Sequence, residues 1–187
     1  MLQFIARLFL RLTGWKAEGN LPAARRYVLL SAPHTSNWDL VYLLAIGFHL
    51  GVKISFMAKH QLFVWPLGPF MRWAGGIPVH RDRRANRVEQ MTERLQAAPR
   101  LALAVPAEGT RTYVPHWKSG FYHIALAARV PIVFGYLDYA RKCGGVGPEM
   151  IPTGKLSEDM ETIRDFYSDV HAKYPECVGE IRLKEEM

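Results

Sequence analysis

Two residues five positions apart, His34 and Asp39, could act together as a catalytic base and its orienting partner. A neutral imidazole can take a proton from a hydroxyl near pH 7. A carboxylate hydrogen-bonded to the other ring nitrogen fixes the tautomer and stabilises the imidazolium that forms. The same residues could instead form a helix-capping turn in which His34 bonds only backbone, so other segments must decide between the two interpretations.

Three later segments carry groups that suit a phosphate-bearing ligand. They are residues 75–81 (GGIPVHR), 106–111 (PAEGTR) and 130–133 (VPIV). A guanidinium such as that of Arg81 can bind phosphate through two parallel hydrogen bonds. Gly109 permits a close backbone approach beside a ligand. Arg83 and Arg84 stand next to Arg81 and are typical of a solvated charge run that opens a helix.

Together with residues 34–39 (HTSNWD), these segments resemble the four sequence blocks of the glycerol-phosphate acyltransferase superfamily. Bacterial members of that superfamily include the 1-acyl-glycerol-3-phosphate acyltransferases. The resemblance implies an acyl transfer from an activated thioester to a hydroxyl, with acyl-CoA or acyl carrier protein as the donor. It also implies that the reaction requires no metal and no other cofactor.

The resemblance assigns a role to each residue of the expected site. His34 is the general base, Asp39 orients it, and Arg81 holds the phosphate of the acceptor. The third block shapes the rest of the substrate site with Glu108, Gly109, Thr110 and Arg111. This sequence departs from the family pattern at Pro78 and His80, so the identity of the acceptor stays open.

Length and charge restrict the kind of protein and its partners. At 187 residues and 49% apolar composition, the chain is long enough for one substantial core but not for two ordinary domains. A net charge of +7 suits an anionic partner. No nucleic-acid reader motif is present, so we expect no nucleic-acid partner. Cys143 and Cys177 form neither a disulfide framework nor a metal-ligand pattern, which favours a reducing compartment.

The first 16 residues predict an amphipathic helix with two arginines on its polar side. Its apolar positions are Leu2, Ile5, Phe9 and Leu12. We expect residues 1–16 to bind an anionic membrane surface, with Trp15 and Lys16 as an interfacial anchor. A helix packed on the domain is an equal alternative, and both could hold.

The chain carries no signal for secretion or membrane spanning. The first residues lack the small-residue cleavage site of a signal peptide. No uncharged run reaches the roughly 20 residues that a spanning helix requires. We therefore expect a cytoplasmic protein that lies peripherally on the inner face of the cell membrane.

The remaining pattern alternates between strands and helices. Short apolar runs bounded by turn residues predict strands at 26–31, 52–58, 77–79, 101–105 and 132–137. Helical spacing of apolar residues predicts helices at 37–50, 85–97, 119–128 and 157–174. This alternation predicts a single α/β acyltransferase domain over residues 22–187, with a largely parallel sheet flanked by helices. His34 and Glu108 would follow strands directly, where α/β sheets gather their site residues.

The aromatic segment 63–73 is broken by Pro66, Gly68 and Pro69. Its aromatic side chains could fill the core, or they could border an acyl groove or a membrane.

The resemblance, together with the intact motif residues, implies an O-acyltransferase. It would move a fatty acyl group to a lysophospholipid, with 1-acyl-glycerol 3-phosphate as the first candidate acceptor. One alternative is the same chemistry on another lysophospholipid, an amino-lipid or a glycolipid. The other is a peripheral membrane-binding protein without turnover, which the intact motif residues argue against.

Overall fold

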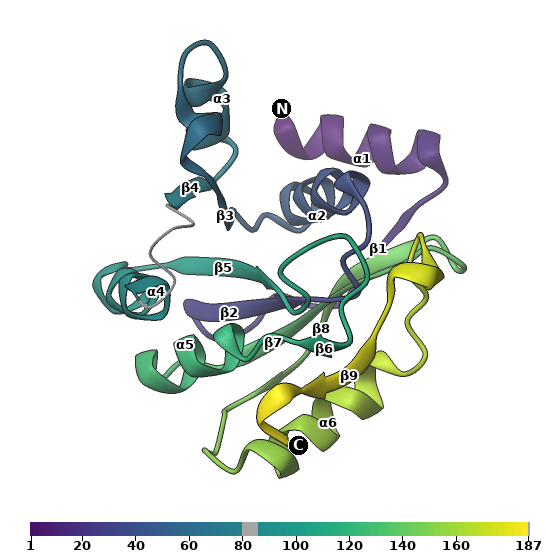
Figure 1. Ribbon diagram of the computed structural model, residues 1–187. Helices are drawn as coiled ribbons and strands as arrows, with labels where there is room; N and C mark the ends of the chain where they lie inside the picture. Colours follow the sequence, from purple (N-terminus) through teal and green to yellow (C-terminus); the bar gives the residue numbers. More distant parts are fainter. Residues whose placement is uncertain (80–85, 187) are drawn as a thin grey trace.

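A seven-stranded sheet crosses the centre of the computed structural model, which describes residues 1–79 and 86–186 (Figure 1). The strand order is β1-β8-β7-β2-β5-β3-β4. The strands are β1 (Lys16–Glu18), β2 (Arg26–Ser31), β3 (Ile54–Lys59), β4 (Gly76–Val79), β5 (Leu101–Pro106), β7 (Ile132–Asp138) and β8 (Cys143–Met150). Neighbouring strands are parallel except β7 and β8. Strands β2, β5 and β7 are nearly continuous apolar runs because helices cover both of their faces.

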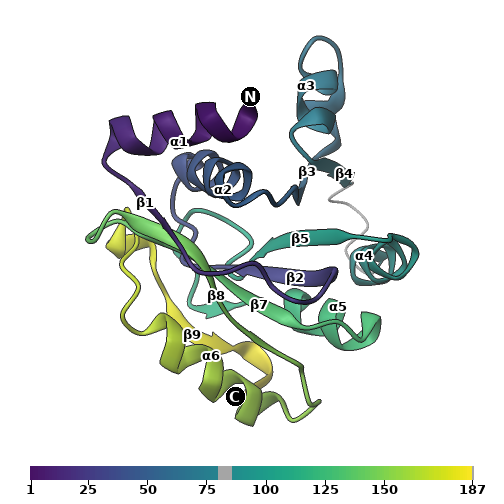
Figure 2. The ribbon, with the colours of Figure 1, turned by 180° about the vertical axis from the view of Figure 1, so that it is seen from behind.

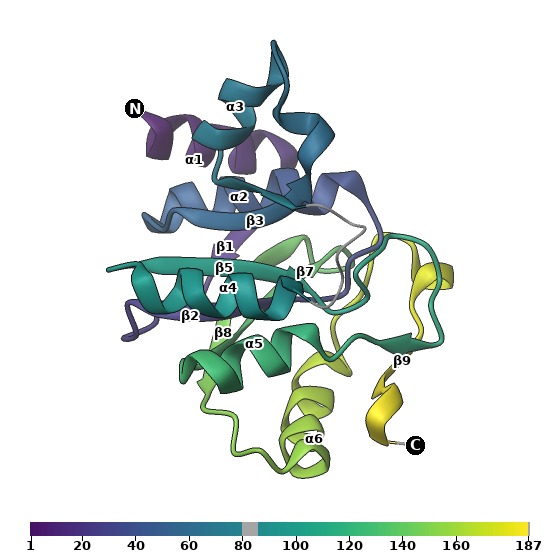
Figure 3. The same ribbon diagram turned by 60° about the vertical axis from the view of Figure 1, so that its left-hand side comes forward.

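Helices cover the sheet on its two faces. Helices α1 (Leu2–Thr13), α2 (Asn37–Leu50) and α3 (Leu67–Trp73) lie on one side in all three ribbon views (Figures 1, 2 and 3). The opposite face packs against α4 (Asn86–Ala97), α5 (Gly120–Ala128) and α6 (Leu156–Tyr167). A small parallel sheet joins β6 (His116–Trp117) to β9 (Glu180–Leu183) near α6. The described residues also form the 3₁₀ turns η1 (His60–Phe63), η2 (Pro175–Cys177) and η3 (Lys184–Glu186).

This architecture confirms the predicted α/β domain with a largely parallel sheet. The last helix is the main correction, because α6 ends at Tyr167 and not at residue 174. The chain turns there, as the Val170 N–H donates to the Tyr167 carbonyl. The His171 carbonyl then accepts the N–H of Tyr139, which fixes this loop beside the end of β7.

Helix α1 packs on α2 through Ala6 and Leu10, which are both buried. The anchor role predicted for Trp15 is wrong. Trp15 is only 6% exposed, and its ring stacks on that of Tyr42 with a centroid distance of 4.1 Å. Lys16 begins β1, so residues 15 and 16 belong to the body of the domain. Among the described residues, no helix is long and apolar enough to span a bilayer.

Candidate active site

The site lies where the strand order reverses, beside the central strand β2. From β2 the chain runs through α2 to β3 on one side, whereas β5 leads through α5 to β7 on the other. Ligands of open α/β sheets bind at such a switch point, outside the carboxyl ends of the strands. His34 comes three residues after β2 ends, and Glu108 comes two residues after β5 ends.

His34 and Asp39 contact each other at this edge of the sheet. The distance from His34 Nδ1 to Asp39 Oδ2 is 3.1 Å. Asp39 is the third residue of α2 and closes a capping box with Ser36, so the start of the helix places the carboxylate. Because Nδ1 faces the carboxylate, Nε2 is the nitrogen that can accept a proton from a substrate.

The Asp39 carboxylate is held on both oxygens. Oδ2 accepts the N–H groups of Thr35 and Ser36, each at 2.8 Å, and Oδ1 accepts the Tyr139 hydroxyl at 2.6 Å. Burial acts to raise the pKa of Asp39, but the hydrogen bonds from His34, Tyr139 and Ser36 outweigh it, so this pKa lies below its usual value. Asp39 is therefore ionised at neutral pH, as the partner of an imidazolium must be.

Tyr139 is a positioning residue that the sequence patterns missed. We expect Tyr139→Phe to lower kcat about 3- to 10-fold, which is less than a full charge-assisted hydrogen bond can contribute, because Asp39 keeps its other donors. Both KM values should stay unchanged. The hydroxyl stabilises the ionised carboxylate, so its loss raises the pKa of Asp39, and the part of the acidic limb of the kcat profile that reports protonation of this carboxylate moves to higher pH.

Tyr122→Phe is the matched control for this variant. Tyr122 also donates a short hydrogen bond to a buried carboxylate, that of Asp159 at 2.7 Å, but it lies away from the candidate base. The control should lose thermal stability without moving the acidic limb. An unchanged acidic limb in Tyr139→Phe would contradict the positioning role.

Glu108 joins the loop after β5 to the loop after β2. Its side chain is 1% exposed, and Oε1 accepts the N–H of His34 at 3.1 Å. Within the described residues, Oε2 has no hydrogen-bond partner. Burial raises the pKa of Glu108 above its usual value. The Glu108 carboxyl group thus holds the backbone of His34 in place by accepting its N–H.

Of Gly109, Thr110 and Arg111 in the third block, only Arg111 lines the cavity that contains His34. Gly109 has a φ of 65°, in the left-handed region where glycine is favoured. Thr110 contacts the Thr112 hydroxyl at 3.2 Å and does not belong to the lining described for either cavity below. Arg111 is exposed and lines the same cavity as His34.

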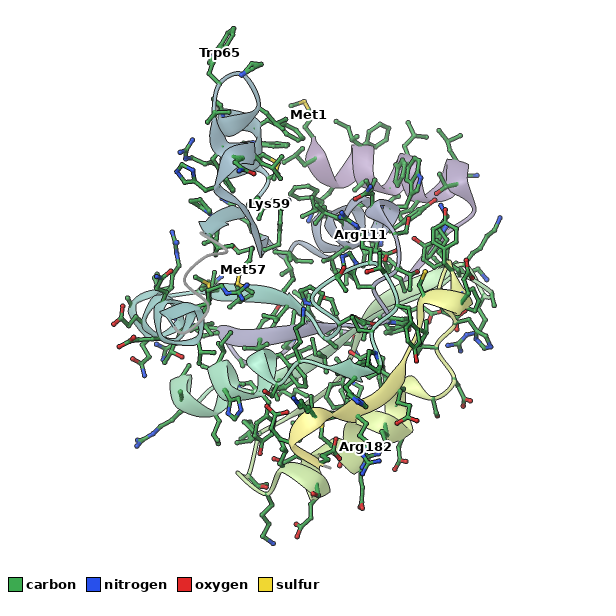
Figure 4. All side chains as sticks on the ribbon, viewed as in Figure 1. Met1, Met57, Lys59, Trp65, Arg111 and Arg182 are labelled. Carbon is green, nitrogen blue, oxygen red and sulfur yellow. The ribbon has the colours of Figure 1, made fainter. Side chains whose placement is uncertain are left out.

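A cavity of about 480 Å³ lies beside the candidate base. His34 and Asp39 line it together with Lys59 and Arg111. Figure 4 shows Lys59 at the end of β3 and Arg111 in the loop that covers the site. The other walls are mainly apolar and include Leu40, Leu43, Phe56, Met57, Leu62 and Met71. The cavity therefore combines an apolar interior with two cations and a base.

A second cavity of about 630 Å³ adjoins the first at Met57, Lys59 and Pro106. It is larger, but it lacks the candidate base, so the first cavity is the candidate active site. The sequence patterns missed Lys59, although its place at the end of a parallel strand could have indicated it. Arg81, which was predicted to hold phosphate, lies outside the described residues. No group of three potential metal ligands occurs among residues 1–79 and 86–186.

The fold and the site define an α/β domain in which a candidate base lines a mainly apolar cavity. The model of the Acyltransferase family matches residues 15–134, which include the His34 and Glu108 blocks. The chain belongs to this family and is an acyltransferase. The resemblance to the glycerol-phosphate acyltransferase superfamily is confirmed.

The fold resembles that of a solved structure. That structure is the 1-acyl-sn-glycerophosphate (LPA) acyltransferase PlsC from Thermotoga maritima. The two chains superpose with a TM-score of 0.61 at 18% sequence identity, over 90% of this chain and 74% of that chain. No curated protein sequence matches the chain.

Proposed function

We propose that this acyltransferase moves a fatty acyl group from acyl-CoA or acyl carrier protein to the hydroxyl of a lysophospholipid. The first candidate acceptor is 1-acyl-glycerol 3-phosphate, the substrate class in the name of the Thermotoga maritima enzyme. The observation that carries the proposal is the single cavity that brings His34 together with Arg111, Lys59 and long apolar walls.

The proposed reaction has one proton to move and one bond to exchange. His34 Nε2 takes the proton from the acceptor hydroxyl while its oxygen attacks the thioester carbonyl carbon. Asp39 stabilises the imidazolium during that step. The tetrahedral intermediate then expels the thiolate as the carbon–sulfur bond breaks, and the imidazolium returns the proton to sulfur. The donor is already an activated thioester, so positioning and proton transfer suffice and no metal is required.

The two cations of the cavity suit the phosphate of the acceptor. We propose that Arg111 and Lys59 bind it, while the apolar walls hold an acyl chain. Charge-assisted hydrogen bonds contribute about 1.5–3 kcal/mol each, so Arg111→Ala should raise the acceptor KM about 10- to 100-fold. Arg111→Lys should recover part of that loss, because lysine keeps the charge but not the paired geometry.

The kinetic comparison requires a control and a donor titration. Arg182→Ala removes an exposed arginine from β9, far from Lys59 and Arg111 in Figure 4, and should change neither KM. The donor KM should stay constant in Arg111→Ala. A change confined to the donor KM would place Arg111 on the wrong substrate.

A product assay tests the function directly. Purified protein is incubated with acyl-CoA or acyl carrier protein and a panel of acceptors, and products are identified by mass spectrometry. The panel contains 1-acyl-glycerol 3-phosphate, other lysophospholipids and monoacylglycerol, which lacks phosphate. We expect the phosphate-bearing acceptors to be preferred. Equal turnover of monoacylglycerol would refute a phosphate-selective site.

We also propose that the protein binds the membrane surface peripherally through α1. The face of α1 turned away from α2 exposes Phe4, Ile5, Leu8 and Leu12, while Ala6 and Leu10 hold the helix on the domain. The two roles expected for this helix are thus compatible in one structure, with Arg7 and Arg11 available for anionic headgroups.

A further inference from the structure

The segment 62–73, which contains all of α3, exposes large apolar side chains in spite of its position beside the core. Phe63 and Met71 are buried and attach the segment to the sheet. Trp65 is 86% exposed, and Figure 4 shows it at the far tip of the segment, pointing away from the sheet. The exposed apolar members are Leu62, Val64, Trp65, Leu67, Phe70 and Trp73.

This segment and α1 lie on the same side of the sheet. Figures 1, 2 and 3 agree on this arrangement, and Figure 4 places Met1 near the level of the 62–73 segment. Large apolar side chains that are exposed together on one side of a folded domain indicate a binding surface. Tryptophan side chains are typical of surfaces that enter the boundary between water and lipid.

The charges of this side favour an anionic lipid surface over an ordinary protein partner. Only Glu18 and Asp39 of the 17 acidic residues precede residue 82, and Asp39 is buried in the site. The exposed cations of residues 1–17 and 40–79 include Arg7, Arg11, Lys53, Lys59 and Arg72. Segments 1–17 and 40–79 therefore combine exposed apolar side chains with positive charge and carry no acidic residue.

The candidate active cavity lies between the two apolar surfaces. Its wall on one side comes from α2, on which α1 packs, through Leu40 and Leu43. Its wall on the other side includes Leu62 and Met71 of the 62–73 segment. An acyl chain that enters from a bilayer in contact with both surfaces would meet these walls before it reaches His34.

We infer that the 62–73 segment is a second membrane-docking element, which enters the headgroup boundary of an anionic bilayer together with α1. The two elements hold the cavity mouth against the lipid, so that the acceptor reaches His34 without leaving the bilayer. The delivery of the acceptor to His34 rests on the proposed function, whereas membrane docking does not. The docking face is defined here as the exposed apolar residues of α1 and of the 62–73 segment.

Vesicle binding by the full chain tests the docking face. The probes are vesicles of phosphatidylethanolamine and phosphatidylglycerol, compared with vesicles of phosphatidylcholine alone. The wild-type chain should sediment with the anionic vesicles, and high salt should weaken this binding. The double variant Trp65→Ser/Phe70→Ser should weaken binding by at least about 10-fold, because two large apolar side chains no longer enter the lipid.

Two matched variants separate the docking face from general surface effects. Phe4→Ser/Ile5→Ser should weaken binding to a similar degree, because it removes two exposed apolar side chains of α1. Leu126→Ser/Ile151→Ser removes two exposed apolar side chains of α5 and of the loop after β8, and should bind like the wild type. All of these side chains are exposed, so melting temperatures should stay close to that of the wild type.

Activity measurements distinguish a failure of docking from a failure of the proposed function. Trp65→Ser/Phe70→Ser should lose turnover of lysophospholipid embedded in vesicles while keeping turnover of the same lipid in detergent micelles. A wild-type chain that binds vesicles but acylates no lysophospholipid contradicts the proposed function alone. Unchanged vesicle binding in the Trp65→Ser/Phe70→Ser variant overturns the docking inference. So does a wild-type dimer that this variant converts to monomer without any vesicle binding, since the face would then join two copies of the chain.

Discussion

His34→Ala should lower kcat by about 10²- to 10⁴-fold, the range that a positioned acid–base group contributes. His34 is the base in the proposed reaction. Its Nδ1 is held 3.1 Å from Asp39 Oδ2, so Nε2 is the nitrogen that accepts the proton of the acceptor hydroxyl. Alanine removes both nitrogens but keeps the backbone N–H that Glu108 accepts. Initial rates at saturating donor and acceptor give the change in kcat directly.

The fold of His34→Ala should survive, because the imidazole is partly exposed and forms little of the core. The melting temperature and circular dichroism of the variant therefore serve as checks. His123→Ala, which removes an exposed histidine of α5, is the control and should keep wild-type activity. A folded His34→Ala protein with near-normal kcat would remove the central assignment.

Asp39→Asn and Asp39→Ala should separate the charge of this residue from its hydrogen bonds. Oδ2 accepts from Thr35, Ser36 and His34, so the amide oxygen of asparagine must take that position and its NH₂ must face Tyr139. The capping turn and the His34 tautomer are then retained. Only the charge is lost, and kcat should fall about 10- to 100-fold.

Asp39→Ala removes the acceptor as well as the charge. The kcat should fall toward the 10²- to 10⁴-fold loss expected for His34→Ala. Loss of the capping box should also destabilise the fold by about 0.5–2 kcal/mol. A loss of that size corresponds to a melting temperature lower by about 1–8 °C for a domain of this length. Equal stability of the alanine and asparagine variants would contradict the structural half of this argument.

The missed elements show where local patterns fail. Residues 143–150 (CGGVGPEM) contain three glycines and a proline, so they have little strand propensity, yet they form β8. The antiparallel pairing with β7 supplies the hydrogen bonds that hold them extended. Strands β1, β6 and β9 are two to four residues long and depend in the same way on a partner that is distant in sequence.

Tryptophan placement is a second example. Trp15 and Trp65 both stand next to turn residues in apolar segments, and periodicity alone does not separate them. Tyr42 of α2 offers a ring on which Trp15 stacks, so that side chain is buried. Trp65 reaches beyond the sheet at the tip of its segment and stays 86% exposed. The presence or absence of a distant packing partner decides which tryptophan is available to a membrane.

The sequence by itself determined what depends on neighbouring residues. Ser36 and Asp39 cap α2 and bring the carboxylate to His34 within six residues, and Gly109 allows a left-handed turn. Only the tertiary structure decided the contacts between distant segments. Glu108 meets His34 across 74 positions and Tyr139 meets Asp39 across 100, because the carboxyl ends of β2, β5 and β7 share one edge of the sheet. No local propensity encodes such contacts, since they exist only after parallel strands have been set side by side.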